Sequence, residues 1–271
     1  MKIFIIILQF TILLSCSRNF VRPAKVADLN SIINKIDPKK VALVGFYPFR
    51  EVFTGREGNT SHYEAILNYQ QDFKIHLKEF GTPIQNIKET GMNHGVSKTK
   101  VNEFCSNYME LVKRSGLPEI SHVVKIKVNA EGSKTTYDCE LKKRDVKYYV
   151  VGILGPPFYK TGKLNPIKAY PTLLLALPTL FTIPLWAESD TETTILVYDE
   201  NLNLLKRWED VSTYQITFAW WNPAREGEGN EFTQPTEAER NKREANKIEL
   251  YQPMLTEFQQ EFYTSITQTK K

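Results

Sequence analysis

The chain has 271 residues, of which 41% are hydrophobic, 12% aromatic and 24% charged, and this composition excludes a wholly disordered chain, collagen and a coiled-coil rod. The net charge of +4 is too small to favour a nucleic-acid partner. Three cysteines exclude a disulfide-dense scaffold and a four-cysteine zinc site. The chain is long enough for one large globular domain or two small ones.

Residues 1–15 have the features of a secretory signal peptide. A single lysine precedes an apolar run over residues 3–14, which is too short for a helix that spans a membrane. Ser15 and Cys16 follow two leucines, and this order resembles a bacterial lipobox. The pattern predicts cleavage before Cys16 and a diacylglycerol on its sulfur atom. The alternatives are an ordinary signal peptide, or an uncleaved anchor, with an incidental cysteine.

Lipidation would hold the protein permanently at a membrane. Each buried acyl CH₂ contributes about 0.8 kcal/mol, and one chain alone binds only marginally, whereas two or three on one residue give stable anchoring. Residues 16–25 are polar and contain a proline, so we expect a short tether there and a single domain over residues 26–271. Ser17, rather than an aspartate, follows Cys16, and this favours the outer membrane, on either its periplasmic or its surface side.

The first half of the domain mixes helical and extended patterns. Apolar spacing over residues 26–36 predicts a helix, and the continuous apolar run within residues 39–46 predicts a buried strand. Residues 63–77 alternate between apolar and polar, which favours a strand or hairpin over a helix. An apolar stripe predicts a helix over residues 97–115, with Ser97 at its start.

The second half is expected to consist mainly of strands. The predicted strands are residues 121–128, 134–141, 147–154, 193–198, 202–208 and 211–221, followed by a helix near the C-terminus with a proline at position 253. The resulting fold class is α+β: a mainly antiparallel sheet with two main helices on one face and an apolar helical insertion broken by prolines.

That insertion covers residues 169–187 and contains three prolines and no charged residue. We favour a broken helical excursion that lies on, or dips into, lipid near the acyl anchor. The first alternative is a core helix, buried under the domain or in a self-association interface. The second is a true membrane span, which the prolines disfavour.

The sequence contains no G-x-S-x-G, H-E-x-x-H, P-loop or Rossmann glycine motif. We therefore predict no catalytic residue, no cofactor and no metal site. Cys105 and Cys139 lie on apolar faces of predicted elements. An exported protein can form a disulfide between them, and two buried free thiols are the alternative.

The order of several motifs resembles the surface-type lipoproteins of spirochaetes, in particular a leptospiral family of unknown molecular activity. The motifs are the lipobox, KKVALVGFYPF, VKYYVVGILGPPFY, the proline-rich apolar stretch, ILVYDENLNLL and AWW. The resemblance implies a lipidated outer-membrane protein and supplies no catalytic residues. We expect a non-enzymatic envelope lipoprotein that binds an unidentified partner. The alternative is an envelope enzyme or assembly factor that acts on lipid or cell wall near the insertion.

Overall fold

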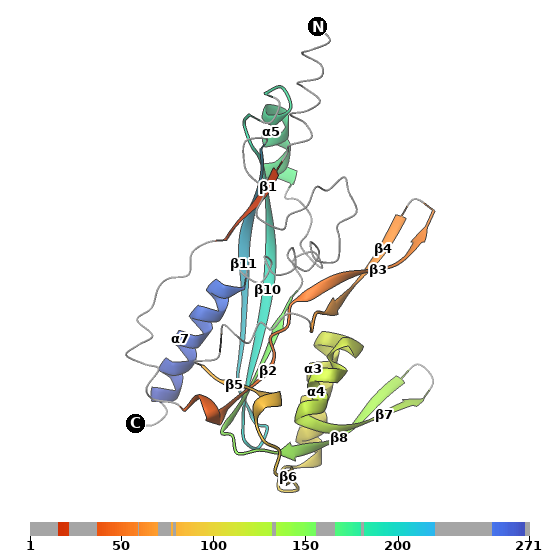
Figure 1. The fold of residues 1–271 in the computed structure, drawn as a ribbon, viewed down its shortest axis with the longest axis vertical. Coiled ribbons are helices and arrows are strands. Elements are labelled where there is room, and N and C mark those ends of the chain that lie inside the picture. The colour runs from red at the N-terminus through yellow and green to blue at the C-terminus, as the bar shows by residue number, and fades with distance from the viewer. Residues whose placement is uncertain are drawn as a thin grey trace. The chain divides into compact units, whose positions relative to one another are not determined.

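The computed structural model describes the chain in nine stretches and shows a mixed α+β fold (Figure 1). The stretches are residues 16–21, 37–58, 60–69, 77, 80–131, 134–155, 166–179, 182–219 and 251–268. The helix predicted over residues 26–36 and the signal peptide lie outside the described residues. The chain divides into two compact units where one domain was expected: unit 1 (Met1–Ala24, Pro156–Glu192, Val211–Pro253) and unit 2 (Lys25–Gly155, Thr193–Asp210, Met254–Lys271).

The main sheet has six strands in the order β1-β11-β10-β9-β2-β5. Their bounds are β1 (Cys16–Val21), β2 (Val41–Gly45), β5 (Thr82–Pro83), β9 (Tyr148–Leu154), β10 (Leu185–Asp199) and β11 (Leu204–Ala219). Strand β2 runs parallel to both β5 and β9, while the pairs β9–β10 and β1–β11 are antiparallel. The sheet is therefore mixed, and the strands predicted over residues 39–46 and 147–154 are confirmed.

Two hairpins complete the strands of unit 2 (Figure 1). Strand β3 (Phe49–Glu57) pairs with β4 (Thr60–Leu67), so a strand is confirmed for the start of the alternating segment, and residues 70–76 lie outside the described part. Strands β7 (Val124–Glu131) and β8 (Lys134–Lys143) form the second hairpin, and the short β6 (Gly91–Met92) pairs with β8.

The helices of the described residues are α3 (Lys98–Val112), α4 (Leu117–Val123), α5 (Pro166–Ala176) and α7 (Gln252–Gln268), with short 3-10 turns at Pro38–Lys40, Ile84–Asn86 and Lys113–Gly116. The helix predicted over residues 97–115 is confirmed. The strand predicted over residues 121–128 is wrong for its first three residues, which belong to α4. Pro118 and Glu119 stand in the first turn of α4, and both residue types favour the start of a helix.

Both faces of the sheet in unit 2 are buried. Val41, Ala42, Leu43 and Val44 are each 0% exposed, although successive side chains of a strand point to opposite faces. Parallel strands with apolar residues at every position need cover on both sides. This requirement decides where the helices lie.

Helices α3 and α7 cover opposite faces of the sheet. Phe104 of α3 packs against Tyr198, with ring centroids 5.0 Å apart, and Tyr198 stands opposite Tyr149 in the β9–β10 register. Phe262 of α7 packs against Tyr148 at 5.8 Å, and neighbouring residues of a strand face opposite ways. The expectation of two main helices on one face is therefore wrong.

The segment after the apolar insertion forms two long strands. Strands β10 and β11 include the hairpin predicted at 193–198 and 202–208, and β11 also takes in most of the strand predicted at 211–221. In the turn between them, the Asp199 carboxylate accepts hydrogen bonds from the backbone N–H groups of Asn201 and Asn203 at 2.9 and 2.8 Å. Leu202 adopts a positive φ of 58°, which closes the turn.

Candidate functional site

The predicted lipid-attachment residue, Cys16, is the first residue of strand β1. Its backbone pairs with Ala219, the last residue of β11, and the register continues to Val21 opposite Tyr214. Residues 16–21 are thus part of a sheet, where a tether was expected over residues 16–25; residues 22–25 lie outside the described part. Lipidation of Cys16 stays a prediction.

The apolar insertion begins as helix α5 and ends in a hydrogen-bonded turn. Proline suits the first position of a helix because its φ is already helical, and Pro166 occupies that position. The Thr179 hydroxyl donates to the Leu175 carbonyl at 2.8 Å and accepts from the Ile183 N–H at 3.2 Å. The helix therefore stops after 11 residues, and strand β10 follows from Leu185.

Large apolar side chains of this segment lie on the surface. The exposed fractions are 65% for Tyr170, 72% for Leu174, 56% for Leu175, 53% for Leu177 and 41% for Ile183. The interpretation as a helix buried under the domain is therefore wrong for these residues. Soluble monomers rarely expose a contiguous apolar patch of this kind unless it contacts something.

Cys16 and the exposed segment lie at the same end of the strands in unit 1. Strands β10 and β11 are joined by a short turn, so the start of β10 at Leu185 and the end of β11 at Ala219 lie at the end opposite that turn. Helix α5 leads into Leu185, and Cys16 pairs with Ala219. Figure 1 shows β1 and α5 together at this end.

Unit 2 contains a buried carboxylate, Glu119, that the sequence patterns did not reveal. Glu119 is 1% exposed; its Oε1 accepts from the Gly45 N–H at 2.9 Å and its Oε2 accepts from Gln85 Nε2 at 2.6 Å. Gly45 and Phe46 both have positive φ, at 77° and 63°. At the end of β2 the backbone therefore has a sparsely populated conformation, and the hydrogen bond from Gly45 to Glu119 helps to hold it. The proline and acid at the start of α4 could have indicated the helix, but not this partner.

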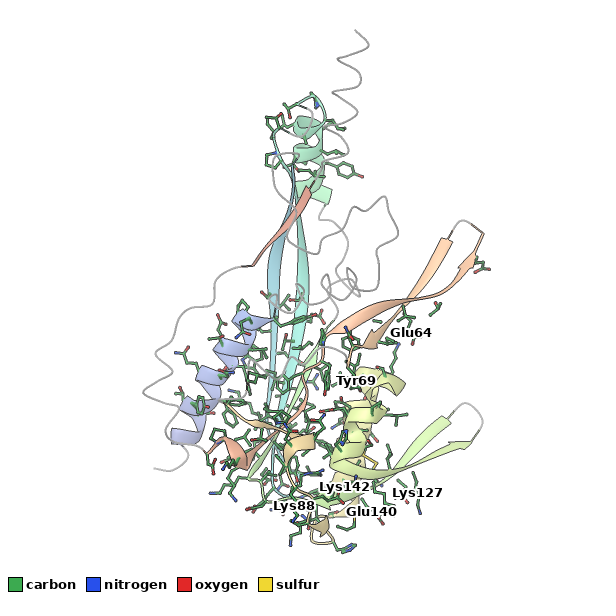
Figure 2. All side chains as sticks on the ribbon, viewed as in Figure 1. Glu64, Tyr69, Lys88, Lys127, Glu140 and Lys142 are labelled. Atoms are coloured by element: carbon green, nitrogen blue, oxygen red, sulfur yellow. A yellow bond between two sulfur atoms is a disulfide. The ribbon has the colours of Figure 1, made fainter. Side chains whose placement is uncertain are left out.

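Tyrosines surround this carboxylate. The rings of Tyr47 and Tyr69 meet edge to face at 4.7 Å, and the Tyr69 hydroxyl donates to the Ser115 carbonyl at 2.6 Å. Figure 2 shows Tyr69 near the base of the β3–β4 hairpin. Burial, with a smaller contribution from Glu119, raises the pKa of Tyr69, and burial likewise raises the pKa of Tyr108. At neutral pH both phenols stay protonated. The Tyr69 hydroxyl donates to Ser115, whereas the buried Tyr108 hydroxyl has no hydrogen-bond partner among the described residues.

Cys105 and Cys139 meet between α3 and β8. Their Sγ atoms are joined as a disulfide, with the Cα atoms 6.9 Å apart, and both residues are 0% exposed. The disulfide ties the helix to the hairpin strand. A hydrogen bond also connects α3 to β8, because Asn102 Oδ1 accepts from the Cys139 N–H at 2.9 Å.

An open cavity of about 410 Å³ lies between the start of α3 and strand β8. Val96, Val101 and Leu141 supply apolar lining, and Lys98 and Glu140 supply charge; Figure 2 shows Glu140 on β8. Lys98 forms an ion pair with Asp138 at 2.9 Å, and this hydrogen bond raises the pKa of Lys98. The cavity belongs to unit 2, whereas the enzyme alternative places its site near the insertion, in unit 1.

Metal ligands and membrane-spanning helices are two further features that could define a site. Within the described stretches, no three or more His, Cys, Asp or Glu residues form a group that could hold a metal ion. None of the helices in those stretches has the length and apolarity needed to cross a membrane. The chain matches no protein-family model, no curated protein and no solved structure.

Proposed function

We propose that the protein is a bacterial envelope lipoprotein, held at the outer membrane by a diacylglycerol on Cys16. One observation carries the proposal: the charge-free, exposed apolar segment lies at the same strand end as the cysteine of the lipobox. An anchored residue brings its end of the sheet to the lipid, and that is where exposed leucines are tolerated. The resemblance to spirochaetal surface lipoproteins supports the outer membrane as the location.

At that membrane, we expect a binding or structural component rather than an enzyme. The buried carboxylate of unit 2 supports this role, because both Glu119 oxygens accept hydrogen bonds that hold the fold at Gly45 and Gln85. The partner is another envelope component or a host molecule.

Metabolic labelling with radioactive palmitate tests the anchor directly. The full chain, expressed in a bacterial host that processes lipoproteins, should incorporate label, and Cys16→Ala should incorporate none. Ser17→Ala is the matched control, because it changes the next residue and keeps the thiol, so it should be labelled like the parent.

An unlabelled parent, or equal labelling of Cys16→Ala, would overturn the proposal. Labelling, rather than membrane fractionation, is the decisive readout, because a second membrane contact could keep an unlipidated protein in the membrane fraction.

A further inference from the structure

We propose that helix α5 and the turn after it form a second, shallow contact with the lipid bilayer surface. We call residues 170–179 and 182–183 the apolar tip. This inference rests on the proposed function, because the lipidated Cys16 is what brings the tip to a membrane. It adds a site that binds lipid through side chains, independently of the acyl chains.

The composition of the apolar tip fits a lipid surface. No charged residue occurs from Ala169 to Ala187, so no charge has to leave water when the tip enters lipid. Leu174 and Leu175 are 72% and 56% exposed. Tyr170, which is 65% exposed, has the apolar ring and polar hydroxyl that favour the boundary between lipid and water.

The geometry of the tip limits it to the interface. Helix α5 has 11 residues, about half of the roughly 20 that a bilayer core requires. Pro171 lies inside the helix, and Pro178 lies in the turn that follows. The Thr179 hydrogen bonds to Leu175 and Ile183 then turn the chain back toward β10.

Its position identifies lipid as the occupant, rather than a second copy of the chain. The tip lies at the strand end that carries Cys16 in register with Ala219, so acyl chains on Cys16 would enter the bilayer beside these leucines. A leucine that leaves water completely contributes roughly tenfold or more to binding. Several such side chains would orient the protein, whereas acyl chains on a single residue leave its rotation free.

The test uses the mature chain, residues 16–271, with Cys16→Ala so that no acyl chain can be attached. Flotation with phosphatidylethanolamine–phosphatidylglycerol vesicles measures its binding. The variant Leu174→Ser/Leu175→Ser should bind about a hundredfold more weakly. The matched control is Leu204→Ser/Leu205→Ser, because these two leucines are also exposed, at 50% and 55%, but lie at the turn end of β11. It should float like the parent.

Three outcomes would overturn the inference. The first two are an unlipidated parent that does not float and equal losses of binding in the two double variants. The third is that Leu174→Ser/Leu175→Ser converts a dimer to a monomer in sedimentation without vesicles, which would mean that the tip binds a second copy of the chain. The palmitate experiment remains separate. Label on Cys16 without flotation rejects the tip alone, and flotation without label rejects the acyl anchor alone.

Discussion

An apolar run of the sequence is buried in unit 2, whereas another is exposed in unit 1. In unit 2, the run Val41–Val44 is 0% exposed at every position, whereas in unit 1 Leu174 is 72% exposed. Both runs lack charge; the sequence predicted a buried strand for the first, whereas for the second it favoured a contact with lipid and left a core helix as the alternative. The contrast shows that an apolar run in the sequence does not by itself decide whether its side chains are buried within the protein.

Backbone hydrogen bonding explains the difference. Strand β2 contains no proline and pairs with β5 on one side and β9 on the other, so it can occupy the middle of a sheet. The insertion has Pro171, Pro178 and Pro184, and each proline removes a backbone donor. Such a segment cannot form a central strand or a long regular helix, and its side chains are left at the surface.

The largest expected effect is on the stability of unit 2 and comes from removing its disulfide. The disulfide between Cys105 and Cys139 encloses a separation of 34 residues, and removing such a link costs about 4 kcal/mol in the chain-entropy account. Cys105→Ala/Cys139→Ala should lower the free energy of urea unfolding by about that amount. Reductant should destabilise the parent and leave the double variant unchanged; equal stability of parent and variant without reductant would show that the thiols are free.

The next effect concerns the buried carboxylate. Glu119→Ala leaves the Gly45 N–H without its acceptor in the interior, which should cost roughly 2–4 kcal/mol of unfolding free energy. Glu119→Gln keeps an oxygen that can accept from Gly45 and should cost less than half as much. Urea titration of both variants measures this, and a harmless Glu119→Ala would mean that the end of β2 holds its conformation unaided.

Alkaline pH should weaken unit 2 through its tyrosines. Burial raises the pKa of Tyr149 to about 12, while an unfolded tyrosine titrates near 10. Between these values the unfolded state binds fewer protons, so stability falls as pH rises, by roughly 1.4 kcal/mol per pH unit for this residue. Tyr149→Phe should make the decline between pH 10 and 12 shallower. Identical curves for the parent and Tyr149→Phe would contradict the assignment.

The smallest expected effect is that of a leucine substitution on the exposed tip, and it tests the comparison between the two units most directly. Leu174→Ala on the apolar tip should change the free energy of unfolding by less than about 0.5 kcal/mol. Leu43→Ala, the same substitution at a buried position, should cost about 2–5 kcal/mol. Thermal or urea unfolding of both variants measures the difference. Equal losses would show that the leucine of the tip is packed against protein.

The elements that could be predicted from sequence are those whose own pattern decides them. Val101, Phe104, Cys105, Tyr108 and Val112 share one helical face, and all five are buried in α3. The apolar run of β9 was equally clear. Partners distant in sequence decide the rest: the polar residues 188–192 were not part of any predicted strand, yet they belong to β10, which pairs with β11.

The same limit applies to the site. Cys16 and the apolar segment are visible as local patterns, but their common strand end follows from the pairing of β1 with β11. Glu119 gave no local signal of its role, because its partner Gly45 is 74 residues away. The cover on both faces of the sheet could have been inferred, since residues 41–44 and 149–151 are apolar at adjacent positions.

If Cys16 is lipidated as we propose, the pairing of β1 with β11 also sets an order of events during biogenesis. Enzymes that attach lipid and cut a leader need an extended, accessible backbone around Cys16, and a docked β1 occupies that backbone with the ladder to residues 214–219. Most of the chain separates the two strands, and contacts so distant in sequence form slowly. For a lipidated chain, cleavage and lipidation at Cys16 therefore come first. Strand β11 then pairs with β1 and completes the sheet.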